Sequence, residues 1–328
     1  MKTSVSLLAL ALLCGSATDA LAQSAGAAAP PRIRLAPEFV PGSVRRYQME
    51  VRTATESRRS GLVEDPQAAS QLEITWNVTV RIEVLPPDAA ALGRTRLRTT
   101  YEKSAATVRS DSFDPQAAAV GEQYEKLQGR VIEFALEPDG KVGEVKGLDE
   151  IVTDPQSARA ARESLAQLAS GAGAPKEEIS PGQTWNSERA ATEAPLAGVV
   201  WRTESSYVRD EPCRLPAELA GSAGALAGEA CAVIVTRFTV AQPRALRDPT
   251  PENYRRQGLR TSGTWSGSGE SLSYISRRTG WVVSVTQSAT QEMDVTIATS
   301  DGQSSVRYAG RVRSQSHISL LPDATAPR

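Results

Sequence analysis

The last third of the chain constrains the fold most, because residues 259–320 hold three long runs in which residue type alternates. Two short turns, at residues 278–280 and 300–302, separate these runs. Alternation with a period of two is typical of a strand that buries one face and exposes the other. Long strands twist or coil. The segment therefore predicts a long antiparallel meander within a larger, curved arrangement.

The first half of the chain carries strands of the same kind. The cleanest covers residues 71–85, and the prolines at 86 and 87 end it, because proline cannot continue a ladder of backbone hydrogen bonds. Asp139-Gly140 is a hairpin signal, which predicts that residues 142–145 return along residues 130–136. One face of the strand at 71–85 is apolar throughout: Leu72, Ile74, Trp76, Val78, Val80, Ile82 and Val84.

One segment has the pattern of a helix. Thr153-Asp154-Pro155-Gln156 combines a cap residue, proline at the first helical position and capping-box spacing. Alanine or leucine at positions 158, 161, 165 and 168 forms one apolar stripe, and Gly171 is a natural helix end. These features predict a mid-chain helix. Similar starts at Asp65 and Asp114 indicate further helix starts or reflect chance in an Ala-rich chain.

Two Pro-Gly turns suggest that the chain contains two similar β-units. Pro41-Gly42 and Pro181-Gly182 are each followed by an aromatic residue, Tyr47 or Trp185, and then by long alternating strands. The alternative is that Pro-Gly simply opens many strands. We predict a mainly β fold of long antiparallel strands that form a curved sheet, half-barrel or sandwich, with one mid-chain helix and two topologically similar halves. The predicted boundaries are residues 37–150 for the first β-unit, 151–178 for the helix and linker, and 179–321 for the second β-unit.

The N-terminus has the pattern of a secretory signal. Lys2 supplies positive charge, residues 7–13 are apolar and Ala20-Leu21-Ala22 is a small-x-small cleavage site. Lipidation at Cys14 is the alternative, but Leu13 stands where a lipobox needs a small residue. A periplasmic or secreted protein is expected, with no transmembrane segment after cleavage. The expected segments are a signal peptide over residues 1–22, a flexible leader over 23–36 and a disordered tail over 322–328.

Cleavage there would leave two cysteines, Cys213 and Cys231, in an oxidising compartment where a disulfide is the default. The alternative is two free thiols. No metal site is expected, because two thiols and the single histidine, His317, cannot fill a soft tetrahedral site. The charge is balanced, with 37 Lys and Arg against 38 Asp and Glu, so the basic footprint of a nucleic-acid-binding protein is missing.

The sequence contains no motif of a common enzyme class. A nucleophile elbow, a Walker loop and a dinucleotide fingerprint are all absent from it. His317 lies in a polar alternating run, so we expect an exposed strand residue rather than part of a Ser-His-Asp triad. Arginines alternate with apolar residues at 94–98 and 307–313, which indicates a solvated face or a surface for acidic head groups or a partner. We predict a non-enzymatic protein without a cofactor.

Four short motifs carry a family resemblance. They are Pro41-Gly42, the hairpin around Pro138-Asp139-Gly140, Pro181-Gly182-Gln183-Thr184-Trp185 and Arg278-Thr279-Gly280. With these motifs the chain resembles an uncharacterised class of bacterial secreted β-rich proteins. At the level of fold, the implied sheet is also similar to the curved half-barrels of periplasmic lipoprotein carriers, which hold acyl chains in an apolar concavity beneath a helix. The resemblance implies no catalytic residue.

Two functions follow as hypotheses. The first is binding of a lipid or another lipophilic ligand on the concave face of the sheet, near the bend that the glycines at 263–269 predict. The alternative for the same side chains is that they fill an ordinary core. The second function is an envelope scaffold or adaptor that binds another protein along a sheet edge. The expected lining residues are Trp76, Val78, Val80, Phe134, Trp265, Trp281 and Val283.

Overall fold

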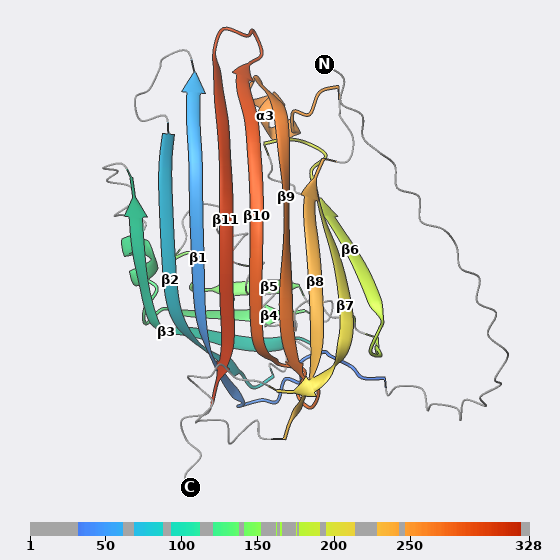
Figure 1. Cartoon of the computed structure of the whole chain (residues 1–328). Coiled ribbons are helices and arrows are strands. Elements are labelled where there is room, and N and C mark those ends of the chain that lie inside the picture. The colour runs from blue at the N-terminus through green and yellow to red at the C-terminus, as the bar shows by residue number, and fades with distance from the viewer. Residues whose placement is uncertain are drawn as a thin grey trace, which may run out of the picture. The chain divides into compact units, whose positions relative to one another are not determined.

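Eleven strands form one antiparallel sheet in the part of the chain that the structure, a computed structural model, describes (Figure 1). The described residues are 32–61, 69–87, 93–111, 121–137, 141–151, 162, 165, 175, 177–190, 195–213, 228–242 and 247–322. The strands are β1 (Val44–Gly61), β2 (Ala69–Val84), β3 (Thr95–Ser110), β4 (Val131–Leu136), β5 (Val142–Lys146), β6 (Thr184–Ala190), β7 (Val200–Pro212), β8 (Ala230–Ala241), β9 (Leu259–Ser276), β10 (Val282–Thr299) and β11 (Ser305–Leu321). Helical conformation is found in α3 (Glu252–Arg256), in residues 121–125 and at Arg162 and Leu165.

The strand order is β5-β4-β3-β2-β1-β11-β10-β9-β8-β7-β6. Consecutive strands are neighbours throughout, except β5 and β6, which form the two edges. The first and last strands, β1 and β11, pair in the middle and join the two halves of the chain. The sheet is curved and does not close. The predicted mainly β fold of long antiparallel strands is therefore confirmed, and its form is one curved sheet rather than a sandwich.

The predicted meander is present as β9, β10 and β11, joined by the two predicted turns. β4 and β5 also pair as the predicted hairpin, although Pro138–Gly140 lie outside the described residues. Figure 1 shows β1, β2 and β8–β11 running side by side along the height of the sheet, with β4 and β5 crossing near its lower end. The curvature therefore brings the short strands of the first half across the lower part of the long ones.

The two Pro-Gly turns have the same local geometry. Gly42 and Gly182 have φ angles of 81° and 88°, values that favour glycine. The N–H of Gly42 donates to Val84 O at 2.8 Å, and that of Gly182 donates to Tyr207 O at 2.6 Å. Each turn thus docks on the strand that pairs with the one it opens, β2 or β7. This shared geometry supports an internal repeat at the start of each half.

The segment before β1 is packed, although residues 32–36 were assigned to a flexible leader. Ile33 bridges Ile179, and Leu35 is 0% exposed. Further along, the N–H of Glu38 donates to Thr279 O at 2.8 Å. Gly280 permits this approach, because a Cβ there would lie 2.1 Å from Ala36 O. Apolar contact thus fixes this segment, which is called the strap (residues 32–39) below.

Of the predicted mid-chain helix, Arg162 and Leu165 are described and helical, and Leu165 is buried. The rest of that helix and the starts at Asp65 and Asp114 lie outside the described residues. Residues 60–61 and 69–70 belong to β1 and β2, because β1 pairs with β2 up to Arg58 and Ala69 and with β11 up to Gly61 and Val306.

Three apolar clusters lie on one side of the sheet. The main core joins β1–β4 to the chain around Trp281: Tyr47, Val78, Val80, Ile82, Val84, Leu97, Ile132, Phe134, Leu136, Leu148, Leu165, Trp281 and Val282. The strap cluster contains Leu35, Ile179, Tyr207, Ala232, Ile234 and Ile275. The upper cluster contains Leu196, Val199, Val240 and Val295, with Trp201, Trp265, Met293 and Ile297 packed against them.

Candidate binding face of the sheet

Strand register assigns each side chain to one of two faces of the sheet. We call the face that carries the three apolar clusters the inner face, and the opposite one the outer face. One inner row across β1, β11, β10 and β9 is formed by Thr53, Ser314, Ala289 and Gly269. Inner positions of β2, β8, β9, β10 and β11, and of β1 from Tyr47 to Ser57, hold no Asp, Glu, Lys, Arg or His. Apart from Arg45 and Arg59 toward the two ends of β1, the described inner positions of these six adjacent strands are therefore uncharged.

The outer face of the same strands is rich in ion pairs. Among those of β10 and β11, Arg311 Nη2 lies 2.5 Å from Glu292 Oε1, and Arg307 pairs with Asp294. Hydrogen bonds from Arg307 hold the pKa of the Asp294 carboxyl below its usual value. Arg98 similarly pairs with Glu133 at 2.7 Å. The arginine rows at 94–98 and 307–313 thus belong to a solvated, largely ion-paired face.

A row of small polar side chains crosses the inner face. It is formed by Ser316, Gln287, Ser271, Thr236 and Ser205, on β11, β10, β9, β8 and β7. The hydroxyls of Ser205 and Thr236 are 2.9 Å apart. Ser316, Gln287 and Ser271 are half-buried, and their side chains form no hydrogen bond with any residue that the structure describes. We call these five residues the hydroxyl–amide row.

Apolar side chains border the hydroxyl–amide row. The row below it contains Met49, Ile318 and Val285, which pack against the main core. The row above it contains Ala289, which is 8% exposed, and Phe238. A Cβ on Gly269 would lie 2.4 Å from Phe238 Cζ, so the missing side chain makes room for this ring over β9. These neighbouring rows also contain small uncharged polar residues, Thr53 and Ser314 above and Ser273 below, so the hydroxyl–amide row lies within a mixed apolar and uncharged surface.

The glycine segment at 263–269 does not interrupt strand pairing. Gly263 has a φ of 130°, and a Cβ there would lie 2.0 Å from Asp294 O. The register between β9 and β10 nevertheless continues through these residues, and the irregularity in this pair lies between Val282 and Ser284. The glycines therefore allow close approach of backbone and side chains.

Trp76 lies where the main core meets the hydroxyl–amide row. Its neighbour Val51 on β1 lies beside Ser316. Trp76 Nε1 donates to Ser104 Oγ at 2.9 Å, and Ser104 Oγ donates to Tyr124 O at 2.6 Å. The rings of Trp76 and Tyr124 have centroids 5.1 Å apart. These contacts fix the indole at one end of the row.

One buried hydroxyl lies among apolar side chains. Thr99 on β3 is 1% exposed, and its inner neighbours are Ile82 and Ile132. Its Oγ1 has no hydrogen-bond partner among the described residues. A buried hydroxyl without a partner costs free energy, so this group is available to a ligand or a water that reaches the main core.

The structure separates the predicted lining residues. Val78, Val80, Phe134 and Trp281 are at most 4% exposed and belong to the main core, against which Trp76 packs. Val283 is 0% exposed beside the register irregularity of β10. Trp265 packs instead in the upper cluster. The hydroxyl–amide row between Trp76 and Trp265 was not predicted, because recognising it requires the register of five strands.

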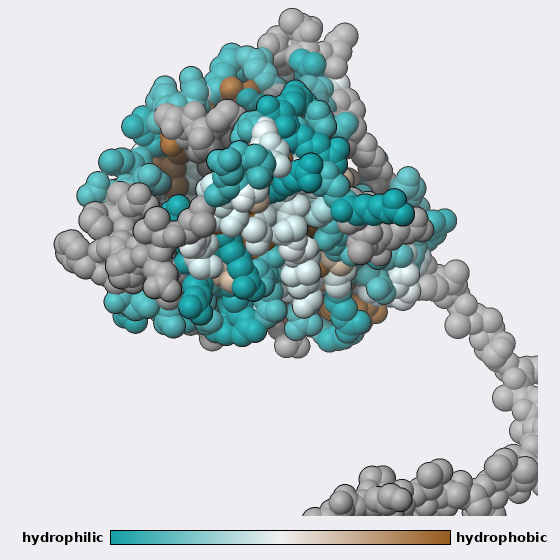
Figure 2. Space-filling model, turned by 90° about the horizontal axis from the view of Figure 1, so that it is seen from above, coloured by the Kyte–Doolittle hydropathy of each residue, from teal (hydrophilic) through white to brown (hydrophobic). Residues whose placement is uncertain are grey.

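Two hollows of about 710 and 460 Å³ open on the described surface. Polar outer-face residues such as Glu56, Arg58 and Asp294 line the first, and Arg237, Glu270 and others line the second. Both therefore differ from the apolar cavity that would hold a lipophilic ligand. Seen from above, Figure 2 shows hydrophilic residues over much of the surface, with paler ones gathered between them.

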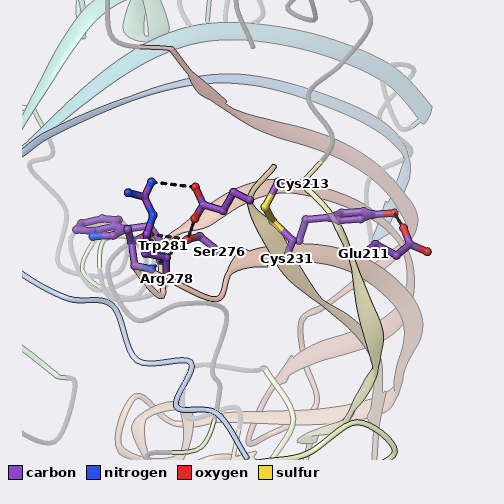
Figure 3. The surroundings of a disulfide bond; sticks show 9 residues. Glu211, Cys213, Cys231, Ser276, Arg278 and Trp281 are labelled. Carbon is purple, nitrogen blue, oxygen red and sulfur yellow. Dashed lines mark hydrogen bonds and ion pairs between the residues drawn. A yellow bond between two sulfur atoms is a disulfide. The ribbon is translucent and has the colours of Figure 1, made fainter. Parts of the chain in front are cut away.

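The predicted disulfide between Cys213 and Cys231 is present, with sulfur atoms 2.04 Å apart (Figure 3). Glu229 beside it accepts a hydrogen bond from Ser276 and pairs with Arg278 at 3.0 Å. These contacts tie β8 to the turn after β9. Among the described residues, no group of three or more His, Cys, Asp or Glu side chains is placed to hold a metal ion.

The single histidine lies on the outer face, exposed as predicted. His317 Nε2 lies 2.8 Å from Ser319 Oγ, and Nδ1 lies 3.0 Å from Thr286 Oγ1. Ser319 is only 2% exposed, so a substrate has little access to its hydroxyl. In the described part of the chain, no helix combines the length and apolar character needed to span a membrane.

Comparison with known proteins yields little. No family model and no curated protein matches the chain. Among solved structures it is similar to DynF from the dynemicin biosynthesis pathway of Micromonospora chersina, with a TM-score of 0.17, 9% identity and 92% of each chain covered. A TM-score this low carries no argument about fold or function.

Proposed function

We propose that this is a non-enzymatic periplasmic or secreted protein that binds a lipophilic small molecule on the inner face of its sheet. The observation that carries the proposal is the absence of charged side chains from the described inner positions of β2, β8, β9, β10 and β11, and of β1 from Tyr47 to Ser57. Half-buried positions that meet only water tolerate charge, as the outer face of the same strands does. Uncharged inner positions instead suit contact with an apolar molecule.

The unclosed sheet supports the same proposal. Its curvature leaves the half-buried centre of the inner face between the main core and the upper cluster. The helical residue Leu165 packs on the inner side at the lower end. A curved, unclosed sheet is the arrangement that the resemblance to lipoprotein-carrier half-barrels implies. The predicted signal peptide and the disulfide are consistent with a compartment outside the cytoplasm.

Native mass spectrometry of protein purified from its own envelope tests the proposal. The expected spectrum contains a population heavier than the processed chain by the mass of one lipophilic molecule. Extraction with organic solvent should remove this mass and leave a folded, unliganded protein. A spectrum of unliganded protein only, together with failure to take up any lipid from mixed vesicles, would exclude the proposal.

A second candidate function rests on the sheet edges. β6 is an edge strand that pairs only with β7 among the described residues, and most of its side chains are exposed. Exposed edges can accept a strand from another protein. An envelope scaffold or adaptor is therefore the alternative. The same native spectrum would favour it if one protein partner appeared in fixed stoichiometry without lipid.

A further inference from the structure

We infer that the ligand is electrically neutral and carries an uncharged polar group, an amide, ester or hydroxyl, that hydrogen-bonds the hydroxyl–amide row. This inference rests on the proposed function and narrows its ligand class. Its basis is the position of Ser316, Gln287 and Ser271 on three adjacent inner strands. It distinguishes the ligand both from a plain hydrocarbon and from a charged amphiphile.

The row offers hydrogen bonds that the described protein does not use. The side chain of Gln287 provides a carbonyl acceptor and two N–H donors, and serine provides a hydroxyl on each side. These half-buried groups have no side-chain partner among the described residues. When an apolar molecule covers them, each loses its water, and leaving it unpaired is costly. A ligand with a matching polar group avoids that cost.

The surroundings of the row exclude a charged head group. No Arg, Lys, His, Asp or Glu occupies an inner position of β2, β8, β9, β10 or β11, or of β1 from Tyr47 to Ser57, and the two charged inner residues of β1, Arg45 and Arg59, lie toward its ends. Taking a carboxylate or an ammonium from water onto such a surface without a counter-charge is far more expensive than moving an amide. The ion pairs of the outer face lie on the opposite side and give no compensation.

Apolar surface beside the row suits the chain of the same ligand. Ala289 and Phe238 lie in the next row up, beside Ser314, and Trp265 and Met293 follow toward the upper cluster beyond the uncharged pair Gln291 and Gly267. With its polar group on Gln287, a lipid would lay its chain along this path. Thr99, whose buried Oγ1 has no described partner, is an independent sign that the apolar interior can take an uncharged polar atom.

A chain-matched panel of four ligands tests this inference. Delipidated full-chain protein is titrated with oleamide, oleate, oleylamine and 1-octadecene at about pH 8, where the acid and the amine carry charge. Tryptophan fluorescence provides the readout, with native mass spectrometry for stoichiometry. Oleamide should bind about tenfold or more tightly than each of the other three, a difference of about 1.4 kcal/mol or more.

Two variants one residue apart provide the matched control. Gln287→Glu places a carboxylate on the inner face, whereas Ser288→Glu places the same charge on the outer face of β10. Gln287→Glu should lose oleamide binding by about tenfold or more, and Ser288→Glu should bind like the parent protein. Gln287→Leu should bind 1-octadecene at least as well as the parent and lose the preference for oleamide.

The outcomes separate the two proposals. If none of the four ligands binds, the proposed function fails. If ligands bind but oleate equals or exceeds oleamide, or if Ser288→Glu is as harmful as Gln287→Glu, the proposed function survives and the neutral-ligand inference is wrong. If circular dichroism shows that Gln287→Glu does not fold, titration of the parent protein and of Gln287→Leu with the four ligands still tests the inference.

Discussion

β10 and β11 supply residues to both the inner and the outer face of the sheet, yet the two faces differ in charge. Outer positions of β10 include Glu292 and Asp294, which pair with arginines of β11. The inner positions next to them hold Gln291 and Met293. Since a strand alternates faces at every residue, composition averaged over the strand hides this difference. The difference shows that the inner face meets a requirement other than contact with water.

The contrast does not hold along the whole sheet. On β8, the outer positions Cys231 and Val233 are 0% and 1% exposed, and the inner position Ile234 is equally buried. This strand is buried on both faces near its start. The lower end is thus a packed core held by a disulfide, whereas the centre of the sheet has one solvated face and one uncharged, half-buried face. The predictions below test this division.

The largest effect is expected from an inner residue of the main core. Phe134 on β4 is 4% exposed and pairs with Leu97 and Val145. Phe134→Ala should lower the free energy of unfolding by about 3–5 kcal/mol, because it removes buried surface and leaves a cavity. Urea unfolding followed by circular dichroism measures the change. Thr107→Ala, on the outer face of β3, should change it by less than about 0.5 kcal/mol. Equal effects of the two variants would refute the division.

The second prediction concerns the covalent link at the lower end. Replacing both Cys213 and Cys231 by serine should destabilise the protein by about 2–4 kcal/mol, because the unfolded chain then gains freedom across the loop. The same unfolding assay applies. Reduction of the parent protein under native conditions should produce a similar loss, which separates the effect of the link from that of burying two serines. A change in ligand binding without a change in stability would contradict a structural role.

A smaller effect is expected at the centre of the inner face. Gly269→Ala would push a methyl group toward Phe238 Cζ and Ser288 O, each 2.4 Å from the ideal Cβ position. Such overpacking should cost about 1–3 kcal/mol and displace the ring beside the hydroxyl–amide row. Thermal unfolding and the oleamide titration are the measurements. Ser268→Ala, on the exposed outer face of the same strand, is the control. If Gly269→Ala binds and unfolds like the parent, Phe238 does not depend on this glycine.

The strands and the inner face differ in how far the sequence predicts them. Alternation over residues 259–320 and 71–85 identified β9–β11 and β2, because apolar and polar residues alternate along a strand that buries one face. The pairing of β1 with β11 left no such local mark, since it joins residues far apart in the sequence, such as Arg46 and Leu321. The hydroxyl–amide row was missed for the same reason.

The strap shows a signal that was present but overlooked. Ile33 and Leu35 are spaced by two residues and separated by Arg34, which is the period of a half-buried strand. The prolines and alanines around them suggested a loose leader. Their burial depends on Ile179, some 140 residues later, and no local pattern reveals that partner.

The smallest effect is expected from an ion pair of the outer face. Asp294 accepts hydrogen bonds from Arg307 Nε at 2.7 Å and Arg307 Nη2 at 2.5 Å. These bonds hold the pKa of Asp294 below its unfolded value, so the pair stabilises the fold above about pH 3.9 and the contribution is lost as pH falls through the lowered pKa. Asp294→Asn should therefore lower the Tm only slightly near neutral pH, because the pair is exposed and screened.

Thermal unfolding of the parent and Asp294→Asn at several pH values checks this sign. The difference in Tm should vanish as the carboxylate of the parent protein protonates, and it should also shrink in about 1 M salt, where the Debye length is about 3 Å. The loss of stability in an inner-face variant such as Phe134→Ala should not depend on pH or salt in this way, because neither phenylalanine nor alanine ionises. If Asp294→Asn lowered the Tm as much as Phe134→Ala, or if its effect persisted in acid, residues of the outer face would stabilise the fold by packing. The division between a solvated outer face and an uncharged inner face would then be wrong.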